Sequence, residues 1–465
     1  MTDPSLSALH SIFASLDGSP MSPDRLMIRT GPDVLATSVP IEDMASGALG
    51  AVGLAVDAVW QARGGARQMV TVDRVAAGLS MESSDYLRVD GQKLDGWDPV
   101  TGFYPARNGA WVYLHGNFAH LRDGLLDLLQ VPNEREAIAH KISGWDAVAL
   151  EAEAIERGLC ASVVRSRESW KAHAQHDPVA ALPLIEIEKI GEAPPEPLPP
   201  AHRPLEGIRL LDLSRVIAGP MAGRTFAEHG ATVMRVASPK LPALESLVIN
   251  TGLGKRSCFI DLTQPDEADR LRTLIGQADV FLDGYRPGSL EARGFGPAQL
   301  AALRPGIISV SLDAWSRSGP WHHRRGYDSL VQAATGLAMA DSPETSQEKP
   351  KRLPCQPLDY LAGYFAAIGA LVALKRRARE GGSWRVAVSL ARTAEWIWDM
   401  TDLMGRKTEV PAASLSETEI DQFKQSLDSP FGQLSVLKPA LSLSETPPGW
   451  SSPPVPLGTH PAAWP

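Results

Sequence analysis

The chain has 465 residues, of which 44% are hydrophobic and 21% charged, which is ordinary for a soluble globular protein of more than one domain. Its formal net charge of −9 argues against a general nucleic-acid-binding or membrane-surface protein, although local basic clusters could bind an anionic ligand. Cys160, Cys258 and Cys355 form no CxxC pair, so we expect neither a disulfide framework nor a metal site. We recognise no signal peptide and no apolar run of membrane-spanning length, so the expected location is the cytoplasm.

The N-terminal part contains a helix–strand unit followed by a segment of mixed character. Asp43 opens a stretch of small apolar residues that predicts a helix, and a strand is expected after it. Between residues 95 and 182, the pattern predicts a strand at Trp111–Leu114 and helices at Leu121–Leu129 and Trp145–Arg157. This mixture is typical of a small α+β domain.

Past a proline-rich stretch, Gly191–Pro204, strands alternate with helices. Strands are predicted at Gly207–Leu213, Ala231–Val236, Cys258–Leu262, Val280–Leu282, Ile307–Leu312 and Trp384–Leu390. Helices are predicted at Ala222–His229, Asp266–Gln277 and Leu361–Arg379. The turn after the first strand lacks GxGxxG, which disfavours a dinucleotide site. The predicted fold class is α/β, with a Rossmann-like, doubly wound parallel sheet domain and a smaller α+β domain.

Two stretches of the chain resemble each other. Ile41–Arg74 aligns without gaps onto Pro357–Leu390. Each reads as an aspartate, a helix of small residues, a basic end, a glycine-rich stop and a strand. Because the register holds through all of these parts, the sequence predicts a partial internal duplication in which Asp43 corresponds to Asp359.

Positive side chains gather near the predicted strand ends of the C-terminal part. Lys255 precedes one strand, and Tyr285 and Arg286 follow another within DGYRPG. Arg293 and Arg325 stand in EARGFG and RRGYD. Cations beside glycines that permit close backbone approach suit an anionic, phosphorylated ligand.

The order of these motifs carries a family resemblance. The series GIRLLDLSRVIAGP, GATVMRV, GKRSCFIDL, DGYRPG, SRSGPW, RGYDSLVQAATG and PLDYLAGYFAAIGALVAL resembles the family III CoA-transferases, the CaiB/BaiF family. The likeness runs from about Pro204 to Trp398, and LGTH near the end of the chain is also similar. Residues 41–80 and 95–185 resemble the Asp–helix–strand unit and the small domain of a second, truncated subunit.

The resemblance implies a reaction and a set of site residues. The family transfers CoA between an acyl-CoA and an acceptor carboxylic acid through an aspartyl anhydride and thioester, and no metal is implied. Asp359 matches the catalytic aspartate. Val216 and Ile217 match the backbone segment along CoA. Contacts with the adenine and phosphates are implied for Lys255, Tyr285, Arg286, Arg293 and Arg325. Three features depart from the family: Ala237-Ser238-Pro239 replaces the usual glutamate, Gly284-Tyr285 stands where members often have Asn-Phe, and the glycine-rich shielding loop of some members has no clear counterpart.

The chemistry of Asp359 can be argued from its position. A carboxylate at the start of a helix would be kept ionised by the helix N-terminus and could attack a thioester carbonyl. For Asp43 we favour a structural role. A racemase of the same fold is the nearest alternative, but Tyr327 stands where its histidine is expected, with His322-His323 as substitutes. A non-catalytic CoA-binding subunit is a second alternative.

The resemblance and the linker together divide the chain. The predicted segments are a partial Asp–helix–strand copy at 1–90 that packs on the large domain, a small α+β domain at 91–186, a proline-rich linker at 187–206, a Rossmann-like CoA-binding domain at 207–404, and a tail at 405–465 that wraps the large domain with little regular structure. We expect one active site per chain, covered by residues 95–185 in cis. A homodimer that supplies the cover in trans is left open.

Overall fold

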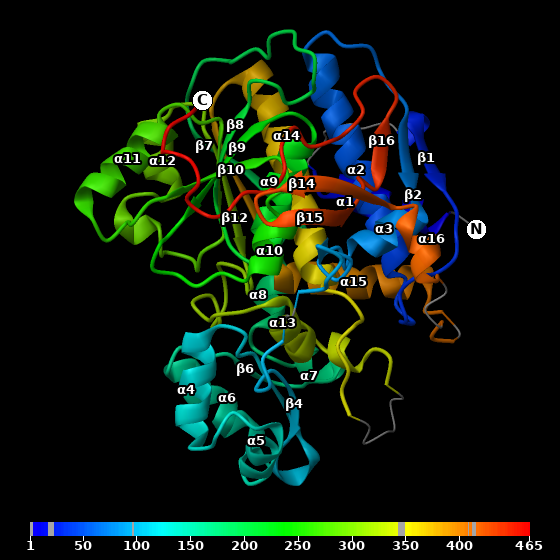
Figure 1. Cartoon of the computed structure of the whole chain (residues 1–465), viewed down its shortest axis with the longest axis vertical. Coiled ribbons are helices and arrows are strands. Elements are labelled where there is room, and N and C mark those ends of the chain that lie inside the picture. Colours follow the sequence, from blue (N-terminus) through cyan, green and yellow to red (C-terminus); the bar gives the residue numbers. More distant parts are fainter. Residues whose placement is uncertain (1–2, 17–22, 95–96, 343–348, 408, 412–414) are drawn as a thin grey trace.

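A seven-stranded sheet organises the C-terminal part of the chain (Figure 1). The computed structural model describes residues 3–16, 23–94, 97–342, 349–407, 409–411 and 415–465. The strand order is β10-β9-β8-β11-β12-β13-β7, and neighbours are parallel except for β7, which is antiparallel to β13. The strands are β7 (Glu186–Gly191), β8 (Arg209–Leu213), β9 (Thr232–Ala237), β10 (Lys255–Phe259), β11 (Val280–Asp283), β12 (Ile308–Asp313) and β13 (Ser383–Ser389). The predicted α/β class with a largely parallel sheet is confirmed.

Helices cover both faces of this sheet because its central strands are apolar on both faces. Alternate side chains of a strand point to opposite faces, so Leu210 joins the core beneath α9 and α14, whereas Leu211 joins a cluster with α11 and α12. The helices of this part are α9 (Ala218–Glu228), α10 (Glu245–Asn250), α11 (Pro265–Ile275), α12 (Pro297–Leu303), α13 (Asp328–Thr335), α14 (Pro357–Glu380) and α15 (Leu390–Met404).

Helix α14 is the central helix of the molecule. It is 24 residues long and apolar enough to cross a membrane by length and composition, contrary to our reading of the sequence, but all of its apolar window is buried in the protein. It packs closely on α9. A Cβ atom at Gly363 would lie 2.6 Å from the Ala218 carbonyl oxygen, so only glycine permits this approach. The contact brings the first turns of α9 and α14 together.

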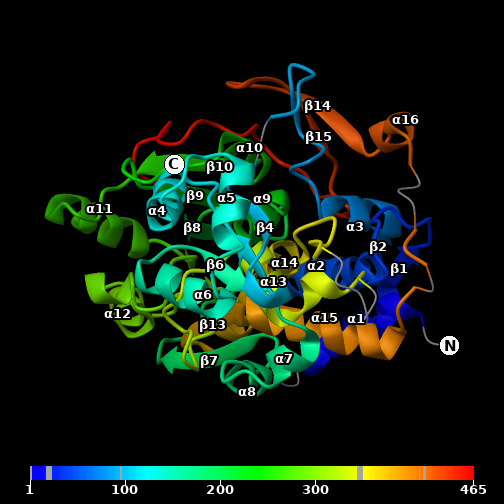
Figure 2. The ribbon, with the colours of Figure 1, turned by 90° about the horizontal axis from the view of Figure 1, so that it is seen from below.

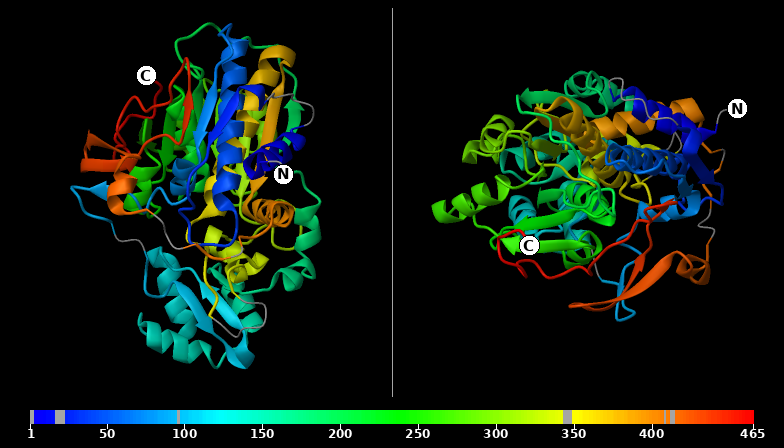
Figure 3. Two further views of the ribbon diagram at one scale, coloured as in Figure 1. Left: turned by 90° about the vertical axis from the view of Figure 1, so that its right-hand side faces the viewer. Right: turned by 90° about the horizontal axis from the view of Figure 1, so that it is seen from above.

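The N-terminal unit lies against α14 rather than in the large sheet. Helix α2 (Ile41–Ala62) packs beside α14 (Figure 3), and α1 (Pro4–Ala14) packs on α2. The strands β1 (Leu26–Arg29) and β2 (Val70–Asp73) pair in parallel in a separate three-stranded sheet. The two similar stretches therefore place their helices side by side but their strands in different sheets. The internal duplication stays a prediction.

We call the segment 97–185 the small domain; its part up to residue 163 forms the lower end of the molecule in Figure 1, whereas its last helix lies higher, against the large part. Its strands make a sheet of order β4-β5-β6 with a core separate from the large one. Its elements are β4 (Gly102–Pro105), β5 (Trp111–Leu114), α4 (Ala119–Leu129), α5 (Arg135–Ile142), α6 (Ala147–Glu156), β6 (Ala161–Val163), α7 (Arg167–Lys171) and α8 (His176–Ala180).

Two expectations about connecting segments are wrong. The first residues of the predicted linker form β7, because their backbone pairs antiparallel with β13 and completes the edge of the sheet. The tail also has regular structure, and its hairpin lies at the periphery (Figure 2), where β15 pairs with β3 (Arg88–Val89). Its elements are α16 (Glu417–Asp421), β14 (Lys424–Ser429), β15 (Gly432–Leu437) and β16 (Leu441–Leu443), which pairs with β2. The remaining elements are α3 (Arg74–Ser80) and 3₁₀ turns at Pro23–Arg25, Arg107–Gly109, Glu291–Arg293 and Leu337–Met339.

Candidate active site

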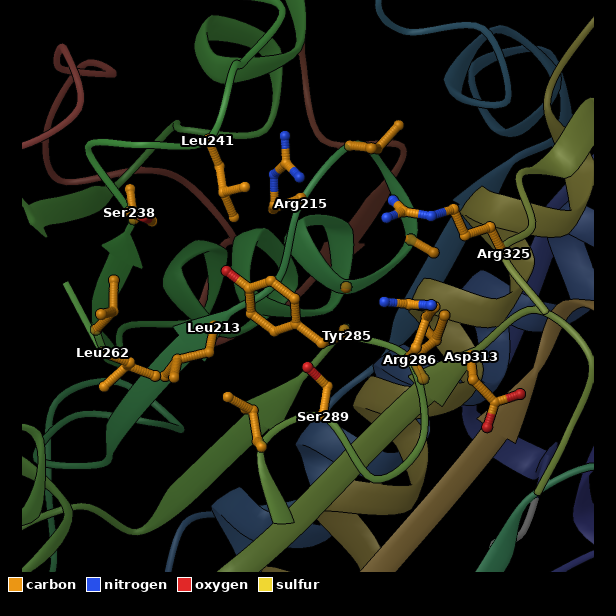
Figure 4. Close-up of a pocket in the computed structure, with 18 of the residues that line it drawn as sticks. Leu213, Arg215, Ser238, Leu241, Leu262, Tyr285, Arg286, Ser289, Asp313 and Arg325 are labelled. Atoms are coloured by element: carbon orange, nitrogen blue, oxygen red, sulfur yellow. The ribbon is translucent and has the colours of Figure 1, made fainter. Parts of the chain in front are cut away.

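A pocket of about 420 Å³ opens at the carboxyl ends of the parallel strands. This is where ligands bind in open α/β sheets, because the loops that follow the strands diverge there. Of the side chains predicted from the sequence, six line the pocket: Val216, Tyr285, Arg286, Arg293, Arg325 and Asp359. Figure 4 shows the Tyr285 ring in the middle of the pocket, near Arg215 and Ser289.

The pocket is cationic although the chain is acidic. Arg215 and Lys240, which the sequence analysis did not single out, line it together with the three predicted arginines. Lys240 pairs with Asp261 at 2.7 Å. Among the described residues, no ion pair involves Arg215, Arg286 or Arg325. Burial and the nearby charge of Arg325 lower the pKa of Arg286. Such unpaired guanidinium groups favour a ligand with more than one negative charge.

The turn between β8 and α9 enters the pocket in a strained conformation. Val216 lines the pocket with a φ of 69°, which is rare for a β-branched residue. The turn also places Ala218 and Gly219, the first residues of α9, in the lining. Their amide groups are at a helix N-terminus, which attracts negative charge.

Asp359 lies in the first turn of α14 and lines the pocket with an exposure of 7%. Burial and the negative charge of Asp328 raise its pKa well above the ordinary value. The expectation that the helix N-terminus keeps Asp359 ionised is wrong, because a raised pKa favours the protonated acid. The amides of Leu358 and Asp359 donate to Asp328 Oδ2, at 2.8 and 3.1 Å, and within the described residues no hydrogen bond reaches the Asp359 carboxyl group.

Asp328 is a buried carboxylate that sequence reasoning placed beside the site without giving it a role. It begins α13, and it accepts a further hydrogen bond of 2.5 Å from Gln332 Nε2. Burial raises its pKa to about 6. The three donors fix Asp328 against the start of α14. The signal in the sequence was the aspartate in RGYD, one helical turn ahead of Gln332.

Two predicted ligand contacts are not in the pocket lining. Ile217 is 5% exposed and belongs to the core beneath α9. Lys255 is 2% exposed, pairs with Asp212 at 2.7 Å and donates to the Pro220 carbonyl. The reason is register, because β10 begins at Lys255 opposite Val233, near the amino ends of the strands. Its side chain is held beneath the first turn of α9 by these partners and does not reach the pocket lining.

The small domain meets the site through aromatic side chains. His115 stacks on Tyr327 with ring centroids 4.0 Å apart, and Phe118 stacks on the same tyrosine with ring centroids 6.0 Å apart. Burial raises the pKa of Tyr327 above its ordinary value and lowers that of His115 to about 3. Neither group is then a base near neutral pH, and His322 and His323 do not line the pocket. These facts disfavour the racemase alternative.

The expectation that residues 95–185 cover the pocket needs correction. All lining residues described for the main pocket lie between Leu213 and Leu390. Phe118 lines only a small adjoining cavity of about 50 Å³. The small domain therefore contacts the walls of the pocket from behind.

Asp43, the counterpart of Asp359 in the alignment, is neutralised by an arginine. Arg74 donates to both of its carboxyl oxygens, at 2.7 and 3.0 Å, and also to Asp33 at 2.8 Å. Ser5 Oγ donates to Asp43 at 3.3 Å. A bidentate pair of this kind removes the free carboxylate that a nucleophile needs.

Comparison with known proteins agrees with this geometry. A family model described as CoA-transferase family III matches residues 205–421. An acyl-CoA transferase of Gibberella moniliformis is 30% identical over 413 residues, which cover 76% of this chain and 72% of that protein. The acetyl-coenzyme A transferase nodX of Hypoxylon pulicicidum is 31% identical over 326 residues, or 64% of this chain and 54% of that protein.

The chain thus spans about half the length of some relatives that it matches. A crystal structure of a hypothetical protein from Mycobacterium tuberculosis is 32% identical, with a TM-score of 0.41, over 44% of this chain and 60% of that one. The extent of the match to the Gibberella moniliformis protein, together with the family model, decides the assignment. The chain belongs to CoA-transferase family III.

Proposed function

We propose that this chain transfers CoA between an acyl-CoA and a carboxylic acid, through a covalent intermediate on Asp359. The observation that carries the proposal is one buried carboxyl group, free of hydrogen bonds among the described residues, in a pocket whose other charged groups are mostly arginines. A CoA thioester needs both, a nucleophile for its carbonyl carbon and cations for its phosphates. The printed names of the relatives, acyl-CoA transferase and acetyl-coenzyme A transferase, support the donor class.

The proposed steps conserve atoms and electrons. An Asp359 carboxylate oxygen attacks the thioester carbonyl carbon, the C–S bond breaks, and CoA leaves as a thiolate. The thiolate attacks the aspartyl carbonyl of the resulting anhydride, which releases the donor's carboxylate and leaves an aspartyl-CoA thioester. An acceptor carboxylate attacks that thioester to form a new anhydride. The thiolate then attacks the acceptor's acyl carbon, which releases the new acyl-CoA and restores the Asp359 carboxylate.

The environment of Asp359 suits these steps. A carboxylate with a raised pKa is a stronger nucleophile than a fully solvated one, provided that the pH is high enough to ionise it. The amides at the start of α9 are candidates for stabilising developing negative charge at the carbonyl oxygen. Arg325, whose charge lies near enough to Arg286 to help burial lower the pKa of Arg286, is a candidate for a phosphate contact together with Arg286.

The domain division belongs to the same proposal. We infer that one chain holds one active site, around Asp359, and that the small domain serves it in cis. The direct contact of Phe118 and His115 with Tyr327 supports the inference. The large domain is proposed to be Rossmann-like and doubly wound, and the cytoplasm is the proposed location.

Trapping the intermediate tests the proposal. The protein is incubated with a panel of acyl-CoAs, its intact mass is measured, and hydroxylamine is added. The expected result is a mass increase by acyl or CoA, followed by a hydroxamate on the peptide that contains Asp359. If CoA binds but no acyl-CoA in the panel modifies the protein, the chain is a CoA-binding subunit and the proposed catalysis is refuted.

A further inference from the structure

The loop from Ala314 to Tyr327, which joins β12 to α13, supplies one wall of the pocket. We call it the β12–α13 loop. Its two ends contribute Ala314, Arg325, Gly326 and Tyr327 to the lining. The loop also holds itself together, because Trp315 Nε1 donates to the Arg325 carbonyl at 3.1 Å. The position of the Arg325 side chain therefore depends on how the rest of the loop is held.

A buried ion triad attaches this loop to the small domain. Glu151, on α6, accepts hydrogen bonds from Arg165 at 2.6 and 3.1 Å and from Arg324 at 3.1 Å. The side chains of Glu151 and Arg324 are 6% and 4% exposed. Although burial alone would raise the pKa of Glu151, the two arginines hold it below its ordinary value. Arg324 also donates to the Ala161 carbonyl and immediately precedes Arg325.

The aromatic residues of the loop complete this attachment. The Arg324 guanidinium carbon lies 4.9 Å from the ring centroid of Trp315 and 4.2 Å from that of Trp321. Arg165 lies 5.2 Å from the Trp321 ring. Cations over aromatic faces add attraction that depends on geometry. Arg324 is thus clamped between a small-domain carboxylate and two side chains of its own loop.

A second small-domain residue holds the same loop at other points. Gln175, which is 0% exposed, donates through Nε2 to the carbonyls of Trp315 and Ser318, at 2.7 and 2.8 Å. Its Oε1 accepts from the Trp321 amide at 2.7 Å. Gly319 has a φ of +84°, and a Cβ there would lie 2.5 Å from Gln175 Oε1. The loop is therefore shaped around this side chain.

We propose that Glu151 and Gln175 are positioning residues, which hold the β12–α13 loop so that Arg325 is in place to bind the CoA moiety of the substrate. The inference rests on the proposed function. It also gives the small domain a role in the site, although none of its residues is in the described lining of the main pocket. The small domain contributes no side chain to the described lining of the main pocket, yet it fixes one wall of that pocket from behind.

Calorimetric titration with CoA itself tests the inference in the full-length chain. Glu151→Gln removes the negative charge at nearly constant side-chain volume. Gln175→Met removes all three side-chain hydrogen bonds, also at nearly constant volume. Each is expected to weaken CoA binding by about tenfold, the size of losing one charge-assisted contact to phosphate. The control is Glu153→Gln, on the same helix, whose exposed partner is Arg157. It should bind CoA as the wild type does.

A double-mutant cycle separates positioning from a general loss of structure. If both residues act through Arg325, then Gln175→Met and Glu151→Gln have little further effect on CoA affinity once Arg325→Ala is present. Full additivity with Arg325→Ala overturns the inference, and so does unchanged CoA affinity in both single variants. If Glu151→Gln fails to fold, the cycle with Gln175→Met decides the question by the same criteria.

The outcomes also distinguish this inference from the proposed function. A wild-type chain that binds CoA, with the expected non-additivity, supports the positioning role even if no acyl-CoA ever modifies Asp359. A chain that forms the aspartyl intermediate but shows additive effects retains its proposed function and loses the inference. A wild-type chain that binds no CoA overturns both.

Discussion

At the residue scale, Asp359 combines two properties that usually oppose each other. Reactivity requires an ionised carboxylate, whereas burial and a neighbouring carboxylate favour the protonated acid. The structure gives the hydrogen-bond donors at the start of α14 to Asp328, which leaves the Asp359 oxygens without competing partners among the described residues. Asp328 therefore organises the helix start while it makes the charge on Asp359 more costly.

Replacement of Asp359 by asparagine should abolish acyl transfer while CoA still binds. The amide keeps the shape of the side chain but cannot attack a thioester as a carboxylate does. Loss of a nucleophile normally lowers kcat by far more than about a hundredfold. Steady-state assays and a CoA titration on the same preparation measure the two effects. Retention of more than about a hundredth of the wild-type rate would show that another residue is the nucleophile.

The pH dependence of acylation should reveal the interaction of the two carboxyl groups. Because the pKa of Asp359 is raised, its reactive carboxylate is lost as the pH falls, so the acylation rate should increase with pH through that pKa. Asp328→Asn removes the neighbouring negative charge and should move this limb to lower pH. Rapid-quench measurement of acylation across pH checks the shift. An unchanged limb in the variant would mean that Asp328 does not set the titration of Asp359.

Lys255→Ala should lower stability, whereas Arg293→Ala should lower CoA affinity. Removing Lys255 leaves the buried Asp212 carboxylate unpaired, which typically costs about 3–5 kcal/mol. Arg293 is exposed and lines the pocket. Denaturant unfolding and CoA titration of both variants separate the effects. As a control, Lys255→Met combined with Asp212→Asn should recover part of the stability. Normal stability with weakened CoA binding in Lys255→Ala would instead restore the phosphate role that the sequence suggested.

At the scale of elements, apolar periodicity and turn-forming residues predicted much of the large sheet. The strands predicted at Gly207–Leu213 and Ile307–Leu312 occur within two residues of those positions, because each is a short stretch rich in Ile, Leu or Val between turn residues. The strand predicted at Cys258–Leu262 begins three residues earlier, at Lys255. A lysine buried by a long-range ion pair gives no local signal, and this error displaced one predicted site residue.

Asp43→Asn should leave acyl transfer unchanged, although its element resembles that of Asp359. Arg74 donates a hydrogen bond to each oxygen of the Asp43 carboxylate, so this carboxylate is not available to attack a substrate. A modest fall in melting temperature is expected, since a partly buried ion pair is broken. Thermal unfolding and the acylation assay together check this. Loss of acylation with normal stability would make the N-terminal unit a second site.

At the scale of the whole molecule, the order of motifs predicted which loops meet, but not how the small domain reaches them. Six of the eight predicted site residues line one pocket because strand ends of a parallel sheet share an edge. The contacts of Glu151 and Gln175 join residues more than a hundred positions apart. No periodicity within the sequence encodes such contacts, so only the three-dimensional structure shows them.

Cutting the chain within the proline-rich segment should yield two halves that need each other. A break between Pro199 and Pro200 spares β7, which completes the sheet, and α2, which covers α14. Co-expressed halves are expected to purify together and to form the aspartyl intermediate, whereas the half with Asp359 alone should be poorly soluble, since the buried surface of α14 is exposed. Full acylation by that half alone would show that the N-terminal part is dispensable.

The strand β7 has a kinetic consequence. The chain enters the small domain from the N-terminal unit, which packs on α14. It leaves the small domain through β7, which belongs to the sheet that carries the pocket, so both ends of the small domain are covalently joined to the same large body. Contact between the small domain and the β12–α13 loop is then an intramolecular event. Its effective concentration is set by short connections, on the order of millimolar, and not by the amount of protein. Turnover per chain should therefore stay constant on dilution, as for a reaction of first order in enzyme.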